Sequence, residues 1–216
     1  MIRRSVVSGL IAFIAVSGAS VACASDDPLA SFLDETTSVV ANFEQELTDS
    51  EGRLVESSRG RLLIERPGRL RWDYEEPDQT VLADGQRLWL FDREVDQVTI
   101  SDQADTLGGS PAALLAGSSD ALNAFERAAT YSVDDIDWFE LTPRNDDVDF
   151  ATVRIGFDDA TLRAMVLDDR LGQRTLIRFS AVTLNESIDD GEFSLEIPTY
   201  VDIVDNTTAA AAAASQ

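Results

Sequence analysis

The sequence predicts a mainly β protein with some α-helix: an unclosed antiparallel β-barrel of about eleven strands, with an N-terminal helix and a short helical lid over a hydrophobic cavity. Apolar and polar residues alternate over most of the chain, and short turns separate the alternating segments, as in consecutive antiparallel strands. Helical spacing is limited to one N-terminal stretch and a short pair of stretches in the middle of the chain. A sheet of so many strands must curl to bury one face, and so few helices can close only one open side of it.

The first 24 residues have the features of a secretory signal peptide. Arg3 and Arg4 supply positive charge, an apolar stretch follows at residues 6–16, and the small residues Ala22 and Ala24 flank Cys23 at a cleavage site. The apolar stretch is shorter than the ~20 residues that span a bilayer. We therefore expect export and cleavage near Ala24.

Cys23 leaves two possibilities open. Cleavage after Ala24 removes it, so that the mature chain contains no cysteine. The segment from Ser20 to Cys23 also loosely resembles a lipobox, and cleavage before Cys23 would leave an acylated, membrane-anchored N-terminus. Ser20 stands where a lipobox usually has a branched apolar residue, which favours removal.

The mature chain opens with a predicted helix over residues 28–41. Pro28 stands in its first turn, and apolar residues recur at intervals of three and four from Leu29 to Val40. The interval then changes to two, which predicts strands as far as residue 101. The Asp84-Gly85 pair is typical of a two-residue hairpin turn. These strands are expected at residues 43–47, 56–66, 70–74, 79–83, 87–92 and 95–101.

A helical insert is predicted after the strand that ends at residue 101. Pro111 begins one helix over residues 112–116, and Asp120 caps a second over residues 121–128. Residues 205–216 are rich in alanine and expected to be disordered, so the folded domain is expected over residues 25–204. Between the insert and the tail, strands are expected at residues 131–135, 138–142, 150–157, 162–168, 175–185 and 193–197.

Charge and composition exclude several functions. The 216 residues include 40 acidic and 17 basic side chains, all of the latter arginine, for a net charge of −23. This balance argues against nucleic-acid binding, which needs a basic surface. The lack of histidine and the single cysteine exclude histidine catalysis, histidine-ligated metals and an intramolecular disulfide. We find no phosphate-binding loop or serine-hydrolase motif, so no catalytic residue, metal or cofactor is expected. The acidic surface suggests a halophilic source.

The most informative segment runs from Arg66 to Tyr74, where Pro67-Gly68 precedes an alternating stretch of apolar and polar residues. Together with other short motifs in the same order, it resembles the periplasmic outer-membrane lipoprotein carrier family (LolA-like) from about residue 29 to residue 198. Leu70 stands where that family often has phenylalanine, and the C-terminal third matches only in pattern. The other motifs are Phe43-Glu44-Gln45, Pro77, Gln79, Asp84-Gly85, Leu88-Trp89, Gln97-Val98-Thr99, Pro111, Leu114 and Leu115.

The resemblance implies a non-enzymatic periplasmic chaperone, expected to be a monomer. Its hydrophobic cavity would take the acyl chains of lipoproteins released by an inner-membrane transporter and deliver them to an outer-membrane receptor. The family's arginine before proline-glycine corresponds to Arg66, which would hydrogen-bond the lid and hold the empty form closed. The residues expected to line the cavity are Leu70, Trp72, Tyr74, Trp89, Phe91, Leu114, Leu115 and Phe125.

Three alternatives remain open at this point. One is an outer-membrane lipoprotein receptor of the same fold, acylated at Cys23. A second is a lipid hydrolase that uses the cavity as a substrate tunnel. The third is a structural β-domain with a filled interior, in which the aromatic stripe at Trp72 is core and Arg66 is an ordinary strand arginine.

Overall fold

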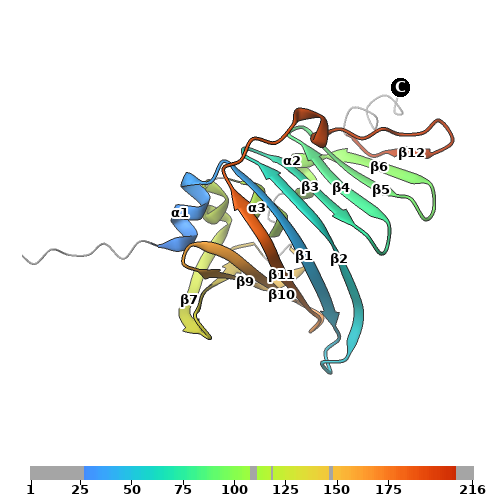
Figure 1. The fold of residues 1–216 in the computed structure, drawn as a ribbon. Coiled ribbons are helices and arrows are strands. Elements are labelled where there is room, and N and C mark those ends of the chain that lie inside the picture. The colour runs from blue at the N-terminus through green and yellow to red at the C-terminus, as the bar shows by residue number, and fades with distance from the viewer. Residues whose placement is uncertain (1–26, 108–110, 118, 146–147, 208–216) are drawn as a thin grey trace, which may run out of the picture.

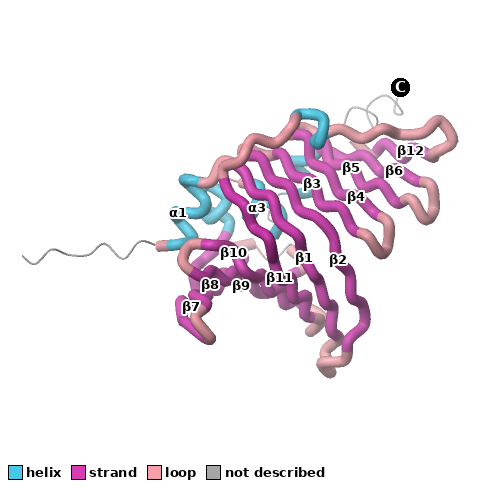
Figure 2. The backbone as a smooth tube through the Cα atoms, viewed as in Figure 1, coloured by secondary structure: helices cyan, strands magenta, loops and turns pink. Residues whose placement is uncertain are grey.

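One open, curled sheet organises the molecule. The computed structural model describes residues 27–107, 111–117, 119–145 and 148–207. Within these residues, twelve strands pair in the order β12-β6-β5-β4-β3-β2-β1-β11-β10-β9-β8-β7. The sheet bends into a half-barrel, and the N-terminal helix and the helices between β6 and β7 lie on its concave side (Figures 1 and 2). The unclosed antiparallel sheet with an N-terminal helix is confirmed, with twelve strands rather than about eleven.

The strands of the first half are β1 (Ser38–Thr48), β2 (Leu54–Glu65), β3 (Arg69–Tyr74), β4 (Gln79–Asp84), β5 (Arg87–Asp92) and β6 (Gln97–Asp102). The strands of the second half are β7 (Phe125–Val133), β8 (Ile136–Pro143), β9 (Phe150–Asp158), β10 (Thr161–Asp169) and β11 (Arg174–Leu184), while the last strand, β12 (Asp202–Asp205), lies beside β6 at the edge of the first half. Neighbouring strands are antiparallel except β12, which runs parallel to β6. Antiparallel pairing of β1 with β11 joins the two halves into one sheet.

Helix α1 (Pro28–Glu35) is shorter than the sequence predicts. The Asp27 side chain caps it by accepting hydrogen bonds from the backbone N–H groups of Leu29 and Ala30, at 3.1 and 3.3 Å. The predicted end at residue 41 is wrong, because β1 already begins at Ser38. The segment that follows Glu35 is rich in β-branched threonine and valine, which favour a strand over a helix.

The helical insert lies between β6 and β7. It contains α2 (Gln103–Leu107), α3 (Pro111–Ala116) and the 3₁₀ helix η1 (Ser119–Ala124). The predicted helix over residues 121–128 is wrong: β7 begins at Phe125, because the backbone from there onward pairs with β8, with one irregularity between Arg127 and Ala129. Pairing with β8 overrides the local helical spacing.

The segment between β11 and β12 crosses the convex face of the sheet. The predicted strand over residues 193–197 is wrong, since the chain forms the 3₁₀ helix η2 (Asp190–Phe193) and then runs without strand pairing to β12. Arg69 and Arg71 anchor it: one guanidinium donates to an Asp190 carboxylate oxygen and the other to the Glu192 carbonyl, both at 2.8 Å. Apolar residues beneath and within the segment pack as two small clusters, made of Leu63, Leu82, Phe193, Phe91, Val98, Ile100 and Val201.

The N-terminal leader and most of the alanine-rich tail fall outside the described part of the chain. The predicted signal peptide (1–24) and residues 208–216 both lie beyond the described ranges. Over the described residues, no helix is long and apolar enough to cross a bilayer.

Asp168 on β10 connects three neighbouring strands on the convex face. Its Oδ1 accepts from Arg174 Nε at 2.6 Å, and its Oδ2 accepts from Thr152 Oγ1 at 3.1 Å and from Arg154 Nη2. Burial alone would raise the pKa of this carboxyl, but the hydrogen bond from Arg174 and the charge of Arg154 together hold it below the ordinary value of 3.8.

We therefore expect Asp168→Asn to lower the free energy of unfolding at pH 7 by about 1–2 kcal/mol. A carboxyl with a depressed native pKa stabilises the fold fully above its unfolded pKa and loses that contribution as pH falls through the native pKa. The difference between wild type and variant should therefore shrink below about pH 4. Urea unfolding at pH 7 and pH 3 measures this, with the exposed Glu94→Gln as a control. A difference that is the same at both pH values would contradict the prediction.

Candidate functional site

Strand register places an apolar surface on the concave face. On β3, Leu70 lies opposite Ile64 and Ala83, and Trp72 lies opposite Leu62 and Val81. The same face continues across β1 and β11 into the second half of the sheet. One large buried cluster results, which contains the inward residues of both halves together with those of the helices.

Three aromatic rings form the centre of this surface on the first half. The Phe43 ring lies 5.3 Å from Trp72 and 5.1 Å from Tyr74, both edge to face, and the rings of Trp72 and Tyr74 stack at 6.3 Å. Gly60 lies between Phe43 and Tyr74 in the cross-strand row, where a Cβ would overlap the Asp73 carbonyl. Burial raises the pKa of Tyr74 to about 12, so its hydroxyl stays protonated at neutral pH.

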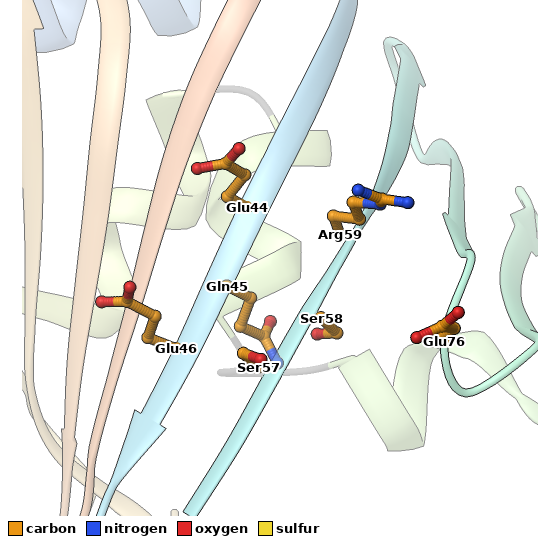
Figure 3. A pocket seen from close by; sticks show the side chains of 7 residues that line it. All are labelled: Glu44, Gln45, Glu46, Ser57, Ser58, Arg59 and Glu76. Atoms are coloured by element: carbon orange, nitrogen blue, oxygen red, sulfur yellow. The ribbon is translucent and has the colours of Figure 1, made fainter. Parts of the chain in front are cut away.

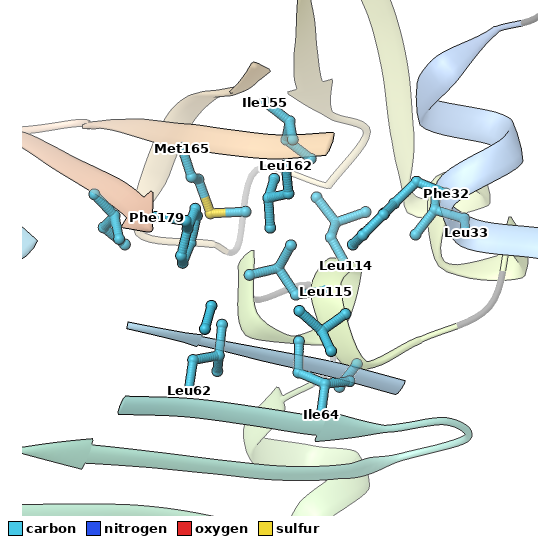
Figure 4. Packing of buried hydrophobic residues seen from close by; sticks show 14 of the residues in the cluster. Phe32, Leu33, Leu62, Ile64, Leu114, Leu115, Ile155, Leu162, Met165 and Phe179 are labelled. Carbon is cyan, nitrogen blue, oxygen red and sulfur yellow. The ribbon is translucent and has the colours of Figure 1, made fainter. Parts of the chain in front are cut away.

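The insert places two leucines in the middle of the half-barrel. Leu114 and Leu115 of α3 are almost fully buried. Figure 4 shows them between Leu62 and Ile64 of β2 on one side and residues of the second half, such as Leu162, on the other. Phe125, at the start of β7, belongs to the same cluster and stacks on Phe150. The helices therefore cover an apolar interior and also fill it in this conformation.

Arg66 holds two of the covering helices. Its Nη1 donates to the carbonyls of Phe32 at 2.6 Å, Leu33 at 3.3 Å and Thr36 at 2.8 Å, at the C-terminal end of α1. Its Nε and Nη2 donate to the Leu115 carbonyl of α3 at 3.2 and 2.9 Å. The guanidinium also lies 4.7 Å from the centre of the Phe32 ring. We call this set of bonds the Arg66 latch.

The latch joins more of the chain than the sequence indicates. The sequence predicts contact with the insert near Leu115, whereas the bonds to α1 were not predicted. The last carbonyls of a helix have no partner within the helix and need hydrogen-bond donors from elsewhere. This rule was the only signal in the sequence for a contact between Arg66 and α1. Burial lowers the pKa of Arg66 to about 10, which still leaves the guanidinium charged at neutral pH.

Two of the predicted cavity residues lie on the wrong face. Trp89 pairs with Leu82 and Phe91 pairs with Thr80, and all four side chains point to the convex side. Trp89 Nε1 donates there to Asp84 Oδ2 at 2.9 Å. The assignment of Trp89 and Phe91 to the cavity was therefore wrong, because apolar residues occupy both faces of β5. Leu70, Trp72, Tyr74, Leu114, Leu115 and Phe125 do come together in the main cluster.

The contribution of the second half of the sheet to the interior was not predicted. Its strands add apolar residues at alternating positions, without the row of aromatic residues that marks β3. Helix α1 adds its own buried face as well. The inward residues not predicted as lining include Leu29, Phe32, Phe43, Leu62, Ile64, Phe139, Phe157, Leu162, Met165 and Phe179.

The concave face becomes polar away from the helices. Gln45 of β1 and Ser58 of β2 pair there. Both line a depression of about 320 Å³ that also includes Glu76 and the Glu44–Arg59 pair, which points to the convex side, so the depression is not confined to the concave face (Figure 3). Within the described residues no cluster of three or more potential ligands could hold a metal ion. The molecule thus offers an apolar interior under the helices and a polar rim at the opposite end.

These features define a class: a half-barrel with an apolar interior, covered by helices that a buried arginine holds in place. The family model for the outer membrane lipoprotein carrier protein LolA matches residues 34–196. The chain belongs to this family, as the resemblance of its motifs indicated.

Named relatives agree with that membership. An outer-membrane lipoprotein carrier protein of Methylobacillus flagellatus is 34% identical over 179 residues, which cover 82% of this chain and 87% of the relative. That of Halorhodospira halophila is 38% identical over 177 residues, with 81% and 83% covered. The solved structure of an uncharacterized conserved protein from Thermus thermophilus matches 82% of this chain and 97% of its own, with a TM-score of 0.53 and 12% identity, and shows the shared fold alone.

Proposed function

We propose that the protein is a periplasmic chaperone that binds the acyl chains of lipoproteins released from the inner membrane and delivers them to an outer-membrane receptor. The observation that carries the proposal is an apolar interior whose helical cover is held by a few hydrogen bonds, most of those to α1 and α3 coming from Arg66, rather than by strand pairing. Such a cover can move without breaking the sheet.

The energetics support a carrier. A triacylated lipoprotein holds on the order of 40 methylenes, each worth ~0.8 kcal/mol in an apolar environment, so that free passage through water costs roughly 30 kcal/mol. The buried cluster on the concave face supplies a surface of the required chemistry once the helices separate from the sheet. The carrier itself needs no nucleotide if affinity for the acyl chains rises from the releasing transporter to the carrier and from the carrier to the receptor.

The binding step can be tested directly. Purified protein should take up an apolar fluorescent probe saturably, and a purified lipoprotein should displace it. Lipid or lipoprotein that copurifies with the protein would be further support. Absence of saturable uptake by the folded monomer would overturn the proposal in favour of a filled structural domain.

Localisation and anchoring belong to the same proposal. We propose that the leader is cleaved near Ala24, which leaves a soluble periplasmic protein without Cys23. The intact mass of the native protein tests this, because a diacylglyceryl group on Cys23 would instead indicate a membrane-anchored receptor. The proposed role requires no catalytic step, and a serine-dependent turnover of ester substrates would contradict it.

A further inference from the structure

Trp72 carries a buried polar atom without a partner. Its side chain is only 7% exposed, and Nε1 has no hydrogen-bond partner among the residues that the structure describes. An indole N–H can only donate, so an acceptor is needed to satisfy it. A buried, unpaired donor is unfavourable, because it has lost water and gained nothing in return. By contrast, Trp89 on the convex face has its acceptor in Asp84.

The position of Trp72 on the concave face is intermediate. Along β3, Leu70 lies on the side of the helices, Trp72 follows, and Tyr74 lies farther from them. On β2 the same direction leads to Ser58, which is 8% exposed and whose Oγ also lacks a partner among the described residues. The two unsatisfied groups therefore lie where the interior changes from apolar to polar. An apolar ligand with one polar end would extend across this boundary.

We propose that the Trp72 N–H donates a hydrogen bond to an ester carbonyl of a diacylglyceryl lipid, with the acyl chains under the helices and the glyceryl end toward Ser58. This inference rests on the proposed function and specifies its ligand chemistry. An alkyl chain has no acceptor, whereas the ester carbonyl is the first acceptor at its end. A neutral ester also needs no cation beside it. Arg66 need not contact the ligand, because its N–H groups already donate to backbone carbonyls.

The diacylglyceryl ester is shared by lipoproteins and phospholipids, so the test compares three probes. They are a synthetic diacylglyceryl lipopeptide, its dialkyl ether counterpart with chains of equal length, and a diacyl phosphatidylethanolamine. The ether lacks the carbonyl but keeps the apolar surface. We expect Trp72→Phe to weaken binding of the diacyl lipopeptide about fivefold and to leave binding of the ether unchanged. Phenylalanine preserves much of the aromatic surface but has no hydrogen-bond donor. Trp89→Phe is the matched control and should affect none of the probes.

Indole signals in ¹H–¹⁵N spectra of the wild-type protein give a second measurement. The Trp72 signal should shift on addition of the diacyl lipopeptide and remain nearly in place with the ether, while the Trp89 signal stays unchanged with both. Ser58→Ala should weaken binding of the diacyl lipopeptide without moving the Trp72 signal of the complex.

The outcomes separate this inference from the proposed function. If Trp72→Phe loses the same affinity for the ester and for the ether, the inference is overturned, because the ring would then act by packing alone. Binding of neither lipopeptide to wild type would overturn both. Tighter binding of the phospholipid, with the same dependence on Trp72, would support the carbonyl contact and overturn lipoprotein as its source.

Discussion

Replacing Arg66 with leucine is expected to block delivery while acceptance of cargo continues. The variant removes every bond of the latch, and hydrogen bonds from a charged donor are worth roughly 1.5–3 kcal/mol each. Closure of the helices over the empty interior then loses these hydrogen bonds and rests on burial of side chains such as Leu114 and Leu115 alone. Because closure helps to expel the acyl chains, cargo should enter the variant from the inner-membrane transporter and remain there instead of passing to the receptor.

A two-step transfer assay with purified membranes and receptor measures both stages. We expect delivery by Arg66→Leu to fall by at least about tenfold, the equivalent of one lost charged hydrogen bond. Arg66→Lys should also be impaired, since a single ammonium cannot reproduce bonds to both α1 and α3. Arg59→Leu, which replaces an exposed arginine on β2, is the control. Delivery by Arg66→Leu at the wild-type rate would remove the latch from the mechanism.

Trp72→Glu is expected to abolish uptake of an apolar probe. The new carboxylate would lie on the concave face against the rings of Phe43 and Tyr74, where a desolvated charge without a partner costs several kcal/mol. A protein that folds around it must admit water to the interior, which destroys the apolar site. Fluorescence titration measures uptake, and circular dichroism shows whether the variant is folded.

A matched change at the surface separates this effect from charge alone. Leu171→Glu adds the same carboxylate at a hairpin tip where the side chain is 84% exposed, and it should bind the probe as wild type does. A folded Trp72→Glu protein with normal uptake would show that Trp72 does not line the binding site.

Strand assignment from the sequence succeeded where polar residues marked one face. Arg71 and Asp73 alternate with Leu70, Trp72 and Tyr74, so only one orientation buries the apolar set. On β5 the residues from Leu88 to Phe91 are all apolar, and nothing local indicates which of them point inward. The answer depends on the segment before β12, which crosses the convex face far along the chain and buries Phe91.

The ends of elements and the latch depended on contacts that local patterns do not contain. Helix α1 stops before Ser38 because that residue already pairs with β2, and β7 starts at Phe125 because β8 is available as a partner. Arg66 could be singled out from its motif, but its bonds to Phe32 and Thr36 require α1 and β2 to meet in three dimensions. Two of the eight predicted cavity residues were misplaced for the same reason.

The route of the chain between β6 and β7 has a mechanical consequence. These two strands are consecutive in sequence but lie near opposite edges of the open sheet, and residues 103–124 connect them. Helix α2 contacts β5 and β6, α3 contacts β2, and η1 contacts β7. The described helices of the cover thus contact both halves of the sheet, with α3 and its Leu115 carbonyl between them. Cargo that spreads the half-barrel separates the surfaces to which the cover is attached, so we expect larger cargo to work against the bonds to Arg66.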